Sequence, residues 1–507
     1  MSIDGAELPP GRLPGTARAA LVAAAGPGGL RDDRGARIRH AAGRGYPDLL
    51  RLRSGRVDPA PDAVATPADA DAVAAVLEVC SGHGLAVVPF GGGTSVVGGV
   101  EPISGDHAGV LALSLAGLSG LRALDERSAT ATLAGGTPLP EAERELARRG
   151  FTLGHFPQSF EYATVGGCVA TRSAGQASTG YGRIDELLRG VELVAPAGRL
   201  TLGARPASAA GPELRQLVAG SEGVLGVIVS ADVEVCQRPL TRHYEGWALA
   251  GFREGADALR TLVQAGAAPE VARLSDEAET QTTLMLSGGG TGSAVLRGYL
   301  RLRRLADGCL LICGWEGDAA DVGRRRHEGA RLLRRFGAVA LGTPPGQAWE
   351  AGRYAAPYLR DALLDDGVMV ETLETASSWS GLERLYLRVR TALTDALAGR
   401  GTPPLVLCHI SHLYRTGASL YFTFMARQQP GAELAQWQAA KSAASEAIVA
   451  AGATITHHHA VGRDHRPWLE AETGALGLQA LAAVKQRWDP AGIMNPGKLG
   501  SQLTAPR

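Results

Sequence analysis

Three adjacent histidines near the carboxyl end of the chain are the most conspicuous group of reactive side chains. His457, His458 and His459 stand between Thr456 and Ala460. Imidazoles titrate near neutral pH, so they suit proton transfer and the stabilisation of an anion. Zinc binding is the competing interpretation, but three consecutive residues rarely supply tetrahedral geometry without a further ligand. In a strand, the first and third rings would share one face and the second ring would take the other.

Tyr421 lies in an alternating aromatic segment, residues 413–424, whose pattern predicts a strand in the core of a sheet. A phenol at this place can also pass a proton to or from a carbon next to a carbonyl group. His409 and His412 precede the segment, and we interpret them as local hydrogen-bonding residues in preference to metal ligands.

Arginine side chains have the right chemistry to hold a phosphate group, and the family resemblance described below singles out two of them. Arg273 and Arg360 carry planar guanidinium groups that bind oxygens in pairs and keep their charge at every physiological pH. An acidic residue follows each of them closely, so a structural ion pair with Asp276 or Asp361 is the competing interpretation.

Three glycine-rich segments are candidates for a phosphate cradle. In the first, a buried apolar run ends in Gly91, Gly92 and Gly93, and two hydroxyl residues follow. Residues 157–182 and 220–228 are the second and third segments. Glycine lets the backbone adopt positive φ and lets N–H groups converge on an anion. The spacing matches neither G-x-G-x-x-G nor the P-loop, and three segments over about 140 residues suit a long dinucleotide.

Together these segments resemble the FAD domain of the vanillyl-alcohol-oxidase/p-cresol-methylhydroxylase flavoproteins. The resemblance extends from about Arg37 to Leu499 and is strongest to the alkyldihydroxyacetonephosphate synthase branch. Relatives with covalent flavin have a histidine where this chain has Thr94, which implies non-covalent FAD. The residues implied to bind FAD are Pro89, Gly91, Gly92, Gly93, Thr94, Ser95, Pro157, Ser159, Thr164, Gly166, Gly167, Thr171, Arg172, Ser173, Glu222, Gly223, Gly226, Val227 and Ile228.

The resemblance also implies an active site. Its members would be Tyr421, Arg273, Arg360, the three histidines 457–459 and His155. The sequence after His155 departs from the family, which has acidic residues after the histidine and proline, so the local charge differs here.

The implied activity is an exchange reaction of ether-lipid synthesis. A fatty alcohol would replace the acyl group of acyl-dihydroxyacetone phosphate through a flavin N5 adduct. The alternative is an FAD-linked oxidase or dehydrogenase of a hydroxy acid, alcohol or natural-product intermediate, because one fold hosts many reactions. A flavin-binding structural protein is the third interpretation, and the polar side chains disfavour it. Residues 409–417 lack the His-Gly-Asp-Gly stretch of a metal-dependent hydroxy-acid dehydrogenase.

Composition narrows the list of partners. Lys plus Arg and Asp plus Glu both number 51 among 507 residues, which leaves no net charge to recruit nucleic acid. The six cysteines are scattered, and Cys309 and Cys313 fit one buried strand, so we expect reduced thiols, a cytoplasmic location and no metal site. The apolar run 19–25 is too short for a span or a convincing signal peptide. A lipid or other small-molecule substrate, membrane contact through a surface patch and a homodimer complete the expectations.

The elements that must position these groups predict an α+β fold. We expect a two-subdomain FAD-binding domain of the p-cresol-methylhydroxylase type, a sheet-and-helix cap domain for the substrate and a C-terminal helical segment that returns to the flavin. We place the boundaries at 1–62 for an N-terminal arm and helices, 63–240, 241–445 and 446–507. Residues 1–36 are predicted to be a partly ordered arm, 37–56 a solvated helix and the glycine run 287–293 a flexible loop.

Overall fold

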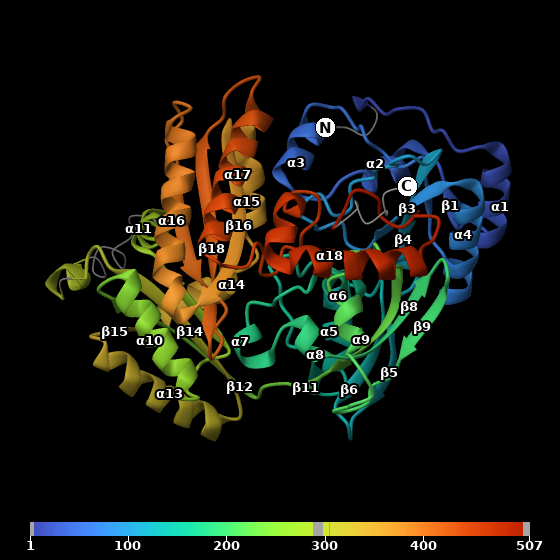
Figure 1. Cartoon of the computed structure of the whole chain (residues 1–507). Coiled ribbons are helices and arrows are strands. Elements are labelled where there is room, and N and C mark those ends of the chain that lie inside the picture. Colours follow the sequence, from blue (N-terminus) through green and yellow to red (C-terminus); the bar gives the residue numbers. More distant parts are fainter. Residues whose placement is uncertain (1–4, 287–297, 304, 500–507) are drawn as a thin grey trace. The chain divides into compact units, whose positions relative to one another are not determined.

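The computed structural model describes residues 5–286, 298–303 and 305–499 (Figure 1). Chain contacts divide the protein into two compact units. The first contains Met1–Ala174, Arg183–Gln237 and His458–Arg507, and the second contains Gly175–Gly182 and Arg238–His457. The predicted four-part division of the chain stays a prediction. The glycine run 287–293 lies outside the described residues.

A four-stranded sheet carries the first glycine turn of the first unit. Its order is β1-β2-β4-β3, in which β2, β4 and β3 are parallel. Nearly every residue of β3 and β4 is buried, as expected for parallel strands covered on both faces. Helix α4 begins after Asp69, which caps it, and ends at the left-handed Gly84 directly before β3. The bounds are Leu30–Arg31 (β1), Ala63–Ala65 (β2), Leu85–Phe90 (β3), Gly109–Ser114 (β4) and Ala70–His83 (α4).

The amino-terminal region is more ordered than the sequence suggests. Helix α1, Gly15–Ala25, packs on α4 through Ala17, Leu21 and Ala25, so the prediction of a partly ordered arm is wrong there. Its stripe consists mainly of alanine, which gives little hydrophobic contrast in the sequence. The solvated helix predicted over 37–56 is also wrong. The structure has α2 (Arg34–Arg39) and α3 (Tyr46–Arg53) instead, and Arg37 is buried, where it donates to the carbonyl oxygen of Pro61.

A second, antiparallel sheet completes the first unit, in the order β5-β6-β10-β8-β9. Helices α5, α6, α8 and α9 add apolar side chains such as Leu139, Val169, Ile184 and Val218 to its core. The strand bounds are Leu121–Asp125, Thr130–Ala134, Leu188–Ala195, Gly198–Leu202 and Val227–Glu234 for β5, β6, β8, β9 and β10. The helix bounds are Leu139–Ala147, Val165–Thr171, Ile184–Leu187 and Leu214–Val218. A small pair, β7 (Phe151–Thr152) and β11 (Cys236–Gln237), lies beside them.

The end of the chain returns to the strand that carries the glycine turn. Helix α18, Leu469–Trp488, is interrupted at Gly474, and the tail after it runs along β3. The N–H of Val87 donates to the carbonyl of Ile493, and the N–H of Asn495 donates to the carbonyl of Val87, both at 2.8 Å. The tail thereby fixes the outer edge of β3.

A seven-stranded antiparallel sheet forms the second unit, in the order β15-β12-β14-β13-β17-β18-β16. Figure 1 shows α16 and α17 side by side along it. Cys309 and Cys313 are buried on β14 as free thiols, as predicted. The strands are Thr241–Leu249 (β12), Val271–Ser275 (β13), Cys309–Gly317 (β14), Val339–Gly342 (β15), Val368–Ser378 (β16), Leu405–Ile410 (β17) and Gly417–Arg427 (β18). The helices are Phe252–Gln264 (α10), Glu277–Leu286 (α11), Ala319–Arg335 (α13), Pro344–Gly352 (α14), Ala356–Asp365 (α15), Trp379–Ala398 (α16) and Glu433–Ala450 (α17).

One short segment joins the second unit although the chain on either side of it belongs to the first. Residues 175–182 contain α7, Ser178–Tyr181. The Ser178 hydroxyl lies 2.7 Å from Nδ1 of His412, and the Tyr181 hydroxyl donates to a Glu316 carboxylate oxygen at 2.6 Å. Side-chain hydrogen bonds therefore attach this segment to the seven-stranded sheet and its loops.

Among the described residues, we find no helix with the length and apolar character needed to cross a lipid bilayer.

Candidate active site

The first glycine turn follows β3 and lies against the residues that precede α6. A methyl group on Gly91 would come within 2.3 Å of the Thr164 hydroxyl oxygen, and one on Gly92 within 1.8 Å of the Tyr162 carbonyl oxygen. Gly93 has a φ of +65°, in the left-handed region. Only glycine allows the two segments to approach this closely.

The third glycine-rich segment meets the same strand. Gly223 has a φ of +74°, and a methyl group there would lie 2.9 Å from the Pro89 ring. At Gly220 a methyl group would lie 2.9 Å from Nε of Arg172, a residue of the second segment. The first unit therefore brings together all three segments that the sequence analysis singled out.

Several side chains predicted to bind the cofactor make hydrogen bonds within the protein. The Ser95 hydroxyl accepts the N–H of Gly99 at 2.9 Å, and Thr171 donates to a carbonyl one turn earlier in α6. The Glu222 carboxylate accepts the N–H groups of residues 461–462. These side chains shape the loops that surround the cradle. The remaining predicted cofactor residues of the three segments are Thr94, Pro157, Ser159, Gly166, Gly167, Ser173, Gly226, Val227 and Ile228.

His155 is completely buried in the first unit. Its Nε2 lies 3.2 Å from the Ser173 hydroxyl oxygen, while its Nδ1 has no hydrogen-bond partner among the described residues. Burial, aided by the charges of His458 and Arg183, lowers its pKa to about 3. A neutral imidazole with one open nitrogen is left, and such a group can bond to a bound molecule.

Tyr421 lies on β18 of the second unit, on the predicted strand. Burial raises the pKa of its phenol to about 12, although a hydrogen bond with Thr372 and the charge of Arg360 act in the opposite direction. Arg360 belongs to α15, and its Nε is buried without a hydrogen-bond partner in the part of the chain that the structure describes. The second unit thus places a protonated phenol within the electrostatic reach of a guanidinium group.

Arg273 of β13 is held by two side chains. Its Nη1 lies 2.9 Å from Nε2 of His409, and its Nη2 donates to a Glu279 oxygen at 2.5 Å. The structural alternative, a pair with Asp276, is wrong, because Asp276 accepts the Tyr386 hydroxyl and lies 3.7 Å from Arg390. His409 is thus a local hydrogen-bonding residue, as predicted.

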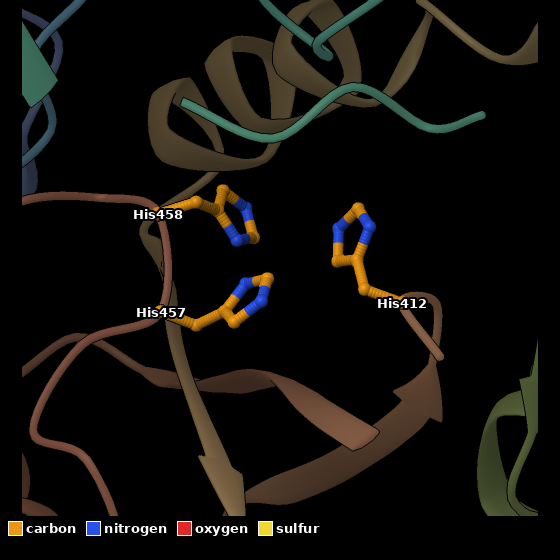
Figure 2. Close-up of side chains that lie close together, drawn as sticks. All are labelled: His412, His457 and His458. Carbon is orange, nitrogen blue, oxygen red and sulfur yellow. The ribbon is translucent and has the colours of Figure 1, made fainter. Parts of the chain in front are cut away.

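His457 is fixed through its backbone and its ring. Glu374 of β16 accepts the backbone N–H of His457 and, at 2.8 Å, the hydroxyl of Thr456. The hydroxyl of Tyr414 lies 2.6 Å from Nε2 of His457. Figure 2 shows the His457 ring facing that of His412, with ring centroids 5.0 Å apart.

The predicted alternation of the three histidines fails because residues 457–459 form bends and not a strand. His457 closes the second unit, while His458 and His459 begin the last part of the first unit. The rings of His458 and His459 meet edge to face, with centroids 4.7 Å apart. The boundary between the units therefore runs through the histidine group.

Comparison with known proteins identifies the family. The family described as FAD linked oxidases, C-terminal domain, matches residues 238–499, and the FAD binding domain family matches residues 61–202. The chain is 33% identical to alkyldihydroxyacetonephosphate synthase of Trypanosoma brucei brucei over 485 residues, which cover 93% of this chain and 78% of that protein. The chain belongs to the alkyldihydroxyacetonephosphate synthase family.

Solved structures agree with this assignment. A crystallised alkyldihydroxyacetonephosphate synthase superposes with a TM-score of 0.84 at 30% identity, covering 98% of this chain and 88% of the other. Substrate-bound p-cresol methylhydroxylase gives a TM-score of 0.70 at 14% identity, over 95% of this chain and 96% of that chain, which supports the fold alone. The predicted α+β fold, with its FAD-binding and cap domains and helical C-terminal segment, is confirmed.

The residues of this synthase-family member fit its cofactor, FAD. At Gly91 and Gly92 a Cβ atom would collide with the opposite segment, so the turn carries no side chain at these two residues. The open Nδ1 of His155 is a buried polar atom that a bound group can satisfy. The protein is an FAD-dependent enzyme that acts on a small-molecule substrate, as the sequence predicted.

The sequence analysis missed Glu279, Glu374 and Tyr414. Glu279 and Glu374 belong to no motif, and Tyr414 has no feature that sets it apart within the aromatic segment 413–424, yet each contacts a predicted site residue. A weak signal existed for Glu279, an acidic residue six positions after Arg273. The other two contact His457 from 83 and 43 residues earlier in the chain, and the sequence does not show that these segments meet.

Proposed function

We propose that this enzyme replaces the acyl group of acyl-dihydroxyacetone phosphate by a fatty alcohol, the reaction expected from the sequence. The observation that carries the proposal is one cluster in the second unit. The Tyr421 ring stacks on the ring of His409, with centroids 4.8 Å apart, and His409 bonds to Arg273. A proton donor next to a permanent cation suits a substrate that carries a phosphate and must lose a proton. Family membership supports the same reaction.

We assign binding of the substrate phosphate to Arg273 and Arg360. Both side chains keep their charge at all working pH values, and a guanidinium group can bind two phosphate oxygens at once. Arg360 has a buried Nε without a partner among the described residues, so a bound anion would satisfy it.

We assign proton transfer to Tyr421. Its raised pKa, about 12, keeps the phenol protonated at neutral pH, so it starts the cycle as a donor. In this proposal the acyl group departs as a fatty-acid carboxylate that takes the Tyr421 proton, and the resulting phenolate takes the proton from the carbon next to the carbonyl. When the fatty alcohol enters, its hydroxyl proton returns to that carbon through Tyr421. His457, held by Glu374 and Tyr414, would stabilise the anion formed on the substrate oxygen. We also propose His155, His458 and His459 as catalytic residues.

We assign FAD binding to the three glycine-rich segments of the first unit, without a covalent bond because Thr94 stands where relatives with covalent flavin have histidine. Bound FAD would supply the reactive isoalloxazine ring at which acyl and alkyl groups are exchanged. The protein's part is to bind, to orient the substrate and to move the proton.

The test is a direct assay of exchange. The purified yellow protein is incubated without oxygen with palmitoyl-dihydroxyacetone phosphate and hexadecanol, and mass spectrometry looks for the ether product. The expected result is an ether product without net bleaching of the flavin. Tyr421→Phe should lower turnover about 100-fold or more, as expected for loss of an acid-base group, while FAD content stays unchanged. Bleaching that depends on substrate, without an ether product, would instead indicate an FAD-linked oxidase or dehydrogenase.

We further propose that the substrate is a lipid, reached by contact of a surface patch with a membrane, and that the enzyme works as a homodimer in the cytoplasm. The chain has 51 basic and 51 acidic side chains. This balance favours docking through a local patch and disfavours docking through a strongly basic surface. Size-exclusion chromatography with light scattering, and flotation with neutral and anionic vesicles, test the two assembly proposals.

A further inference from the structure

Four side chains from four elements form one connected cluster in the second unit. Arg273 comes from β13, Glu279 from α11, His409 from β17 and Tyr421 from β18. The register of the sheet brings them together, because His409 pairs with Tyr421 on one side and with Ser275 on the other. The cluster therefore depends on the core of the sheet and not on a mobile loop.

Glu279 holds two of these side chains at once. One carboxylate oxygen accepts a hydrogen bond from Arg273 at 2.5 Å, and the other lies 3.2 Å from Nδ1 of His409. The carboxylate is itself fixed, because Glu279 is 9% exposed and its backbone N–H donates to Asp276 at 2.8 Å. Glu279, Arg273 and His409 thus all contact one another, and Glu279 is the member whose position is fixed by burial and by its backbone.

The third contact, between Arg273 and His409, determines which nitrogen of His409 carries the proton. An arginine can only donate, so Nε2 of His409 must accept from Arg273, across 2.9 Å. The proton of the imidazole is then on Nδ1, where it points to Glu279. Burial and the charge of Arg273 lower the pKa of His409, which agrees with a neutral ring. A neutral ring can stack flat on Tyr421, at an interplanar angle of 18°.

We propose that Glu279 is a positioning residue: through Arg273 and His409 it aims the guanidinium group at the substrate phosphate and holds the ring against which Tyr421 packs. The inference rests on the proposed function, since it names how the phosphate end of that substrate is held. A free arginine side chain loses rotamer entropy when it binds a phosphate, and hydrogen bonds that already hold the side chain remove much of that cost before the substrate arrives. At least two of the five N–H donors of Arg273 are used in its contacts with His409 and Glu279. These two hydrogen bonds fix the orientation of the guanidinium group.

A purely structural ion pair is the competing explanation. The two explanations predict opposite changes in phosphate affinity when Glu279 loses its charge. Removing a negative charge beside a cationic phosphate site should strengthen phosphate binding by simple Coulomb attraction. Loss of positioning should weaken it. The direction of the change in phosphate affinity therefore separates them.

The experiment compares Glu279→Gln with Glu277→Gln in the holoenzyme. Glu277 is the carboxylate two residues earlier on α11, and it accepts the backbone N–H of Phe252, away from the cluster. Two quantities are measured: the dissociation constant of dihydroxyacetone phosphate by calorimetry, and the KM values for palmitoyl-dihydroxyacetone phosphate and hexadecanol. For Glu279→Gln we expect about tenfold weaker binding of the phosphate compound, about tenfold higher KM for the acyl substrate and an unchanged KM for hexadecanol. Glu277→Gln should match the wild type.

Glu279→Asp provides the conservative variant. It keeps the charge but draws the carboxylate back by one methylene, so phosphate binding should be weakened about threefold, between the wild type and Glu279→Gln. If Glu279→Gln does not accumulate with FAD bound, this variant decides, and an unchanged dissociation constant overturns the proposal.

The outcomes also separate this inference from the proposed function. Equal or tighter phosphate binding in Glu279→Gln overturns the positioning role even when the wild type makes the ether product. Weaker binding with no ether product from the wild type supports the positioning role and removes the exchange reaction.

Discussion

The proposed FAD cradle of the first unit and the polar cluster of the second are built by opposite means. Gly91, Gly92 and Gly223 serve the cradle by lacking side chains, so that backbone segments can approach one another. Arg273 and Tyr421 serve the cluster through side-chain charge and a transferable proton. A backbone site fails when atoms are added, whereas a side-chain site fails when one group loses its charge or its direction. The two units should therefore respond to different substitutions.

The largest effect is expected in the cradle. In Gly92→Ala the new methyl group would lie 1.8 Å from the Tyr162 carbonyl oxygen, a backbone atom that cannot swing away. Forcing the segments apart costs roughly 1–3 kcal/mol, so we expect about 10- to 100-fold weaker FAD binding and loss of activity in preparations without added FAD. The ratio of absorbance at 450 nm to that at 280 nm measures the bound flavin.

Gly82→Ala is the matched control, because a methyl group there meets nothing within 4 Å and the residue lies in helix α4. It should keep its full FAD content and should be slightly more stable, since alanine favours a helix over glycine. Full flavin content in Gly92→Ala would mean that the close approach is not needed for the cradle.

The contrast also explains what the sequence could predict. The glycines of the cradle are consecutive in the sequence and can be recognised there. Gly91–Gly93 follow an apolar run, and the family resemblance places the cofactor at this turn. Strand β18 was predictable for the same reason, because its alternation is local. Helix α1 was not, because a buried stripe of alanine and one leucine gives little signal.

The partners in the second unit could not be predicted for a physical reason. Glu279 lies 130 residues before His409 and Glu374 lies 83 before His457, and only the folded second unit brings each pair together. The sequence suggested Asp276 as the partner of Arg273, because Asp276 is nearer in the chain. In the structure Asp276 accepts the Tyr386 hydroxyl instead. Side-chain sites assembled across a sheet need the pairing order before their members can be named.

The clamp at Arg273 makes a prediction about acid stability. Burial opposes ionisation of Glu279, but the hydrogen bonds of His409 and Arg273 and the charge of Arg273 prevail and lower its pKa from 4.5 to about 2. An acid with a lowered folded pKa stabilises the protein above pH 4.5 and loses that contribution as the pH falls towards 2. The contribution at neutral pH is about 3 kcal/mol at most, and about 1 kcal/mol of it should be lost by pH 3.5.

The measurement is urea unfolding of the wild type and Glu279→Gln between pH 6 and pH 3.5, followed by the fluorescence of the buried Trp247 and Trp315. The difference in unfolding free energy between the two proteins should shrink as the pH falls. A difference that stays constant with pH would show that Glu279 is not ionised by its partners.

An effect of similar size, on kcat and not on FAD binding, is expected at Glu374, which holds the histidine segment. Its two oxygens accept the Thr456 hydroxyl and the His457 backbone N–H. In Glu374→Gln one oxygen becomes an NH₂ group, which faces a donor, and a buried donor without an acceptor costs roughly 1–3 kcal/mol. We expect kcat of the exchange reaction to fall about 10- to 100-fold with FAD content unchanged.

Glu371→Gln tests whether such a loss is only a matter of stability. Glu371 lies on the same strand and is equally buried, but it accepts the Trp437 indole N–H. It should lower the melting temperature by a similar amount and leave kcat near the wild-type value. Equal losses of kcat in both variants would assign Glu374 to the fold alone.

The smallest effect is expected at Tyr414, whose hydroxyl lies 2.6 Å from Nε2 of His457. Tyr414→Phe removes one hydrogen bond worth roughly 0.5–1.5 kcal/mol and leaves the ring contact, so kcat should fall about 2- to 10-fold with KM unchanged. Tyr244→Phe, which removes a phenol hydrogen bond to Glu316, is the control and should affect stability only. The ratio of the kcat losses in Tyr414→Phe and Glu374→Gln then shows how much the hydrogen bond to the His457 ring contributes relative to the hydrogen bond to its backbone. If Tyr414→Phe changes nothing while Glu374→Gln lowers kcat, backbone position alone holds the histidine, and this part of the second unit works by the same means as the cradle.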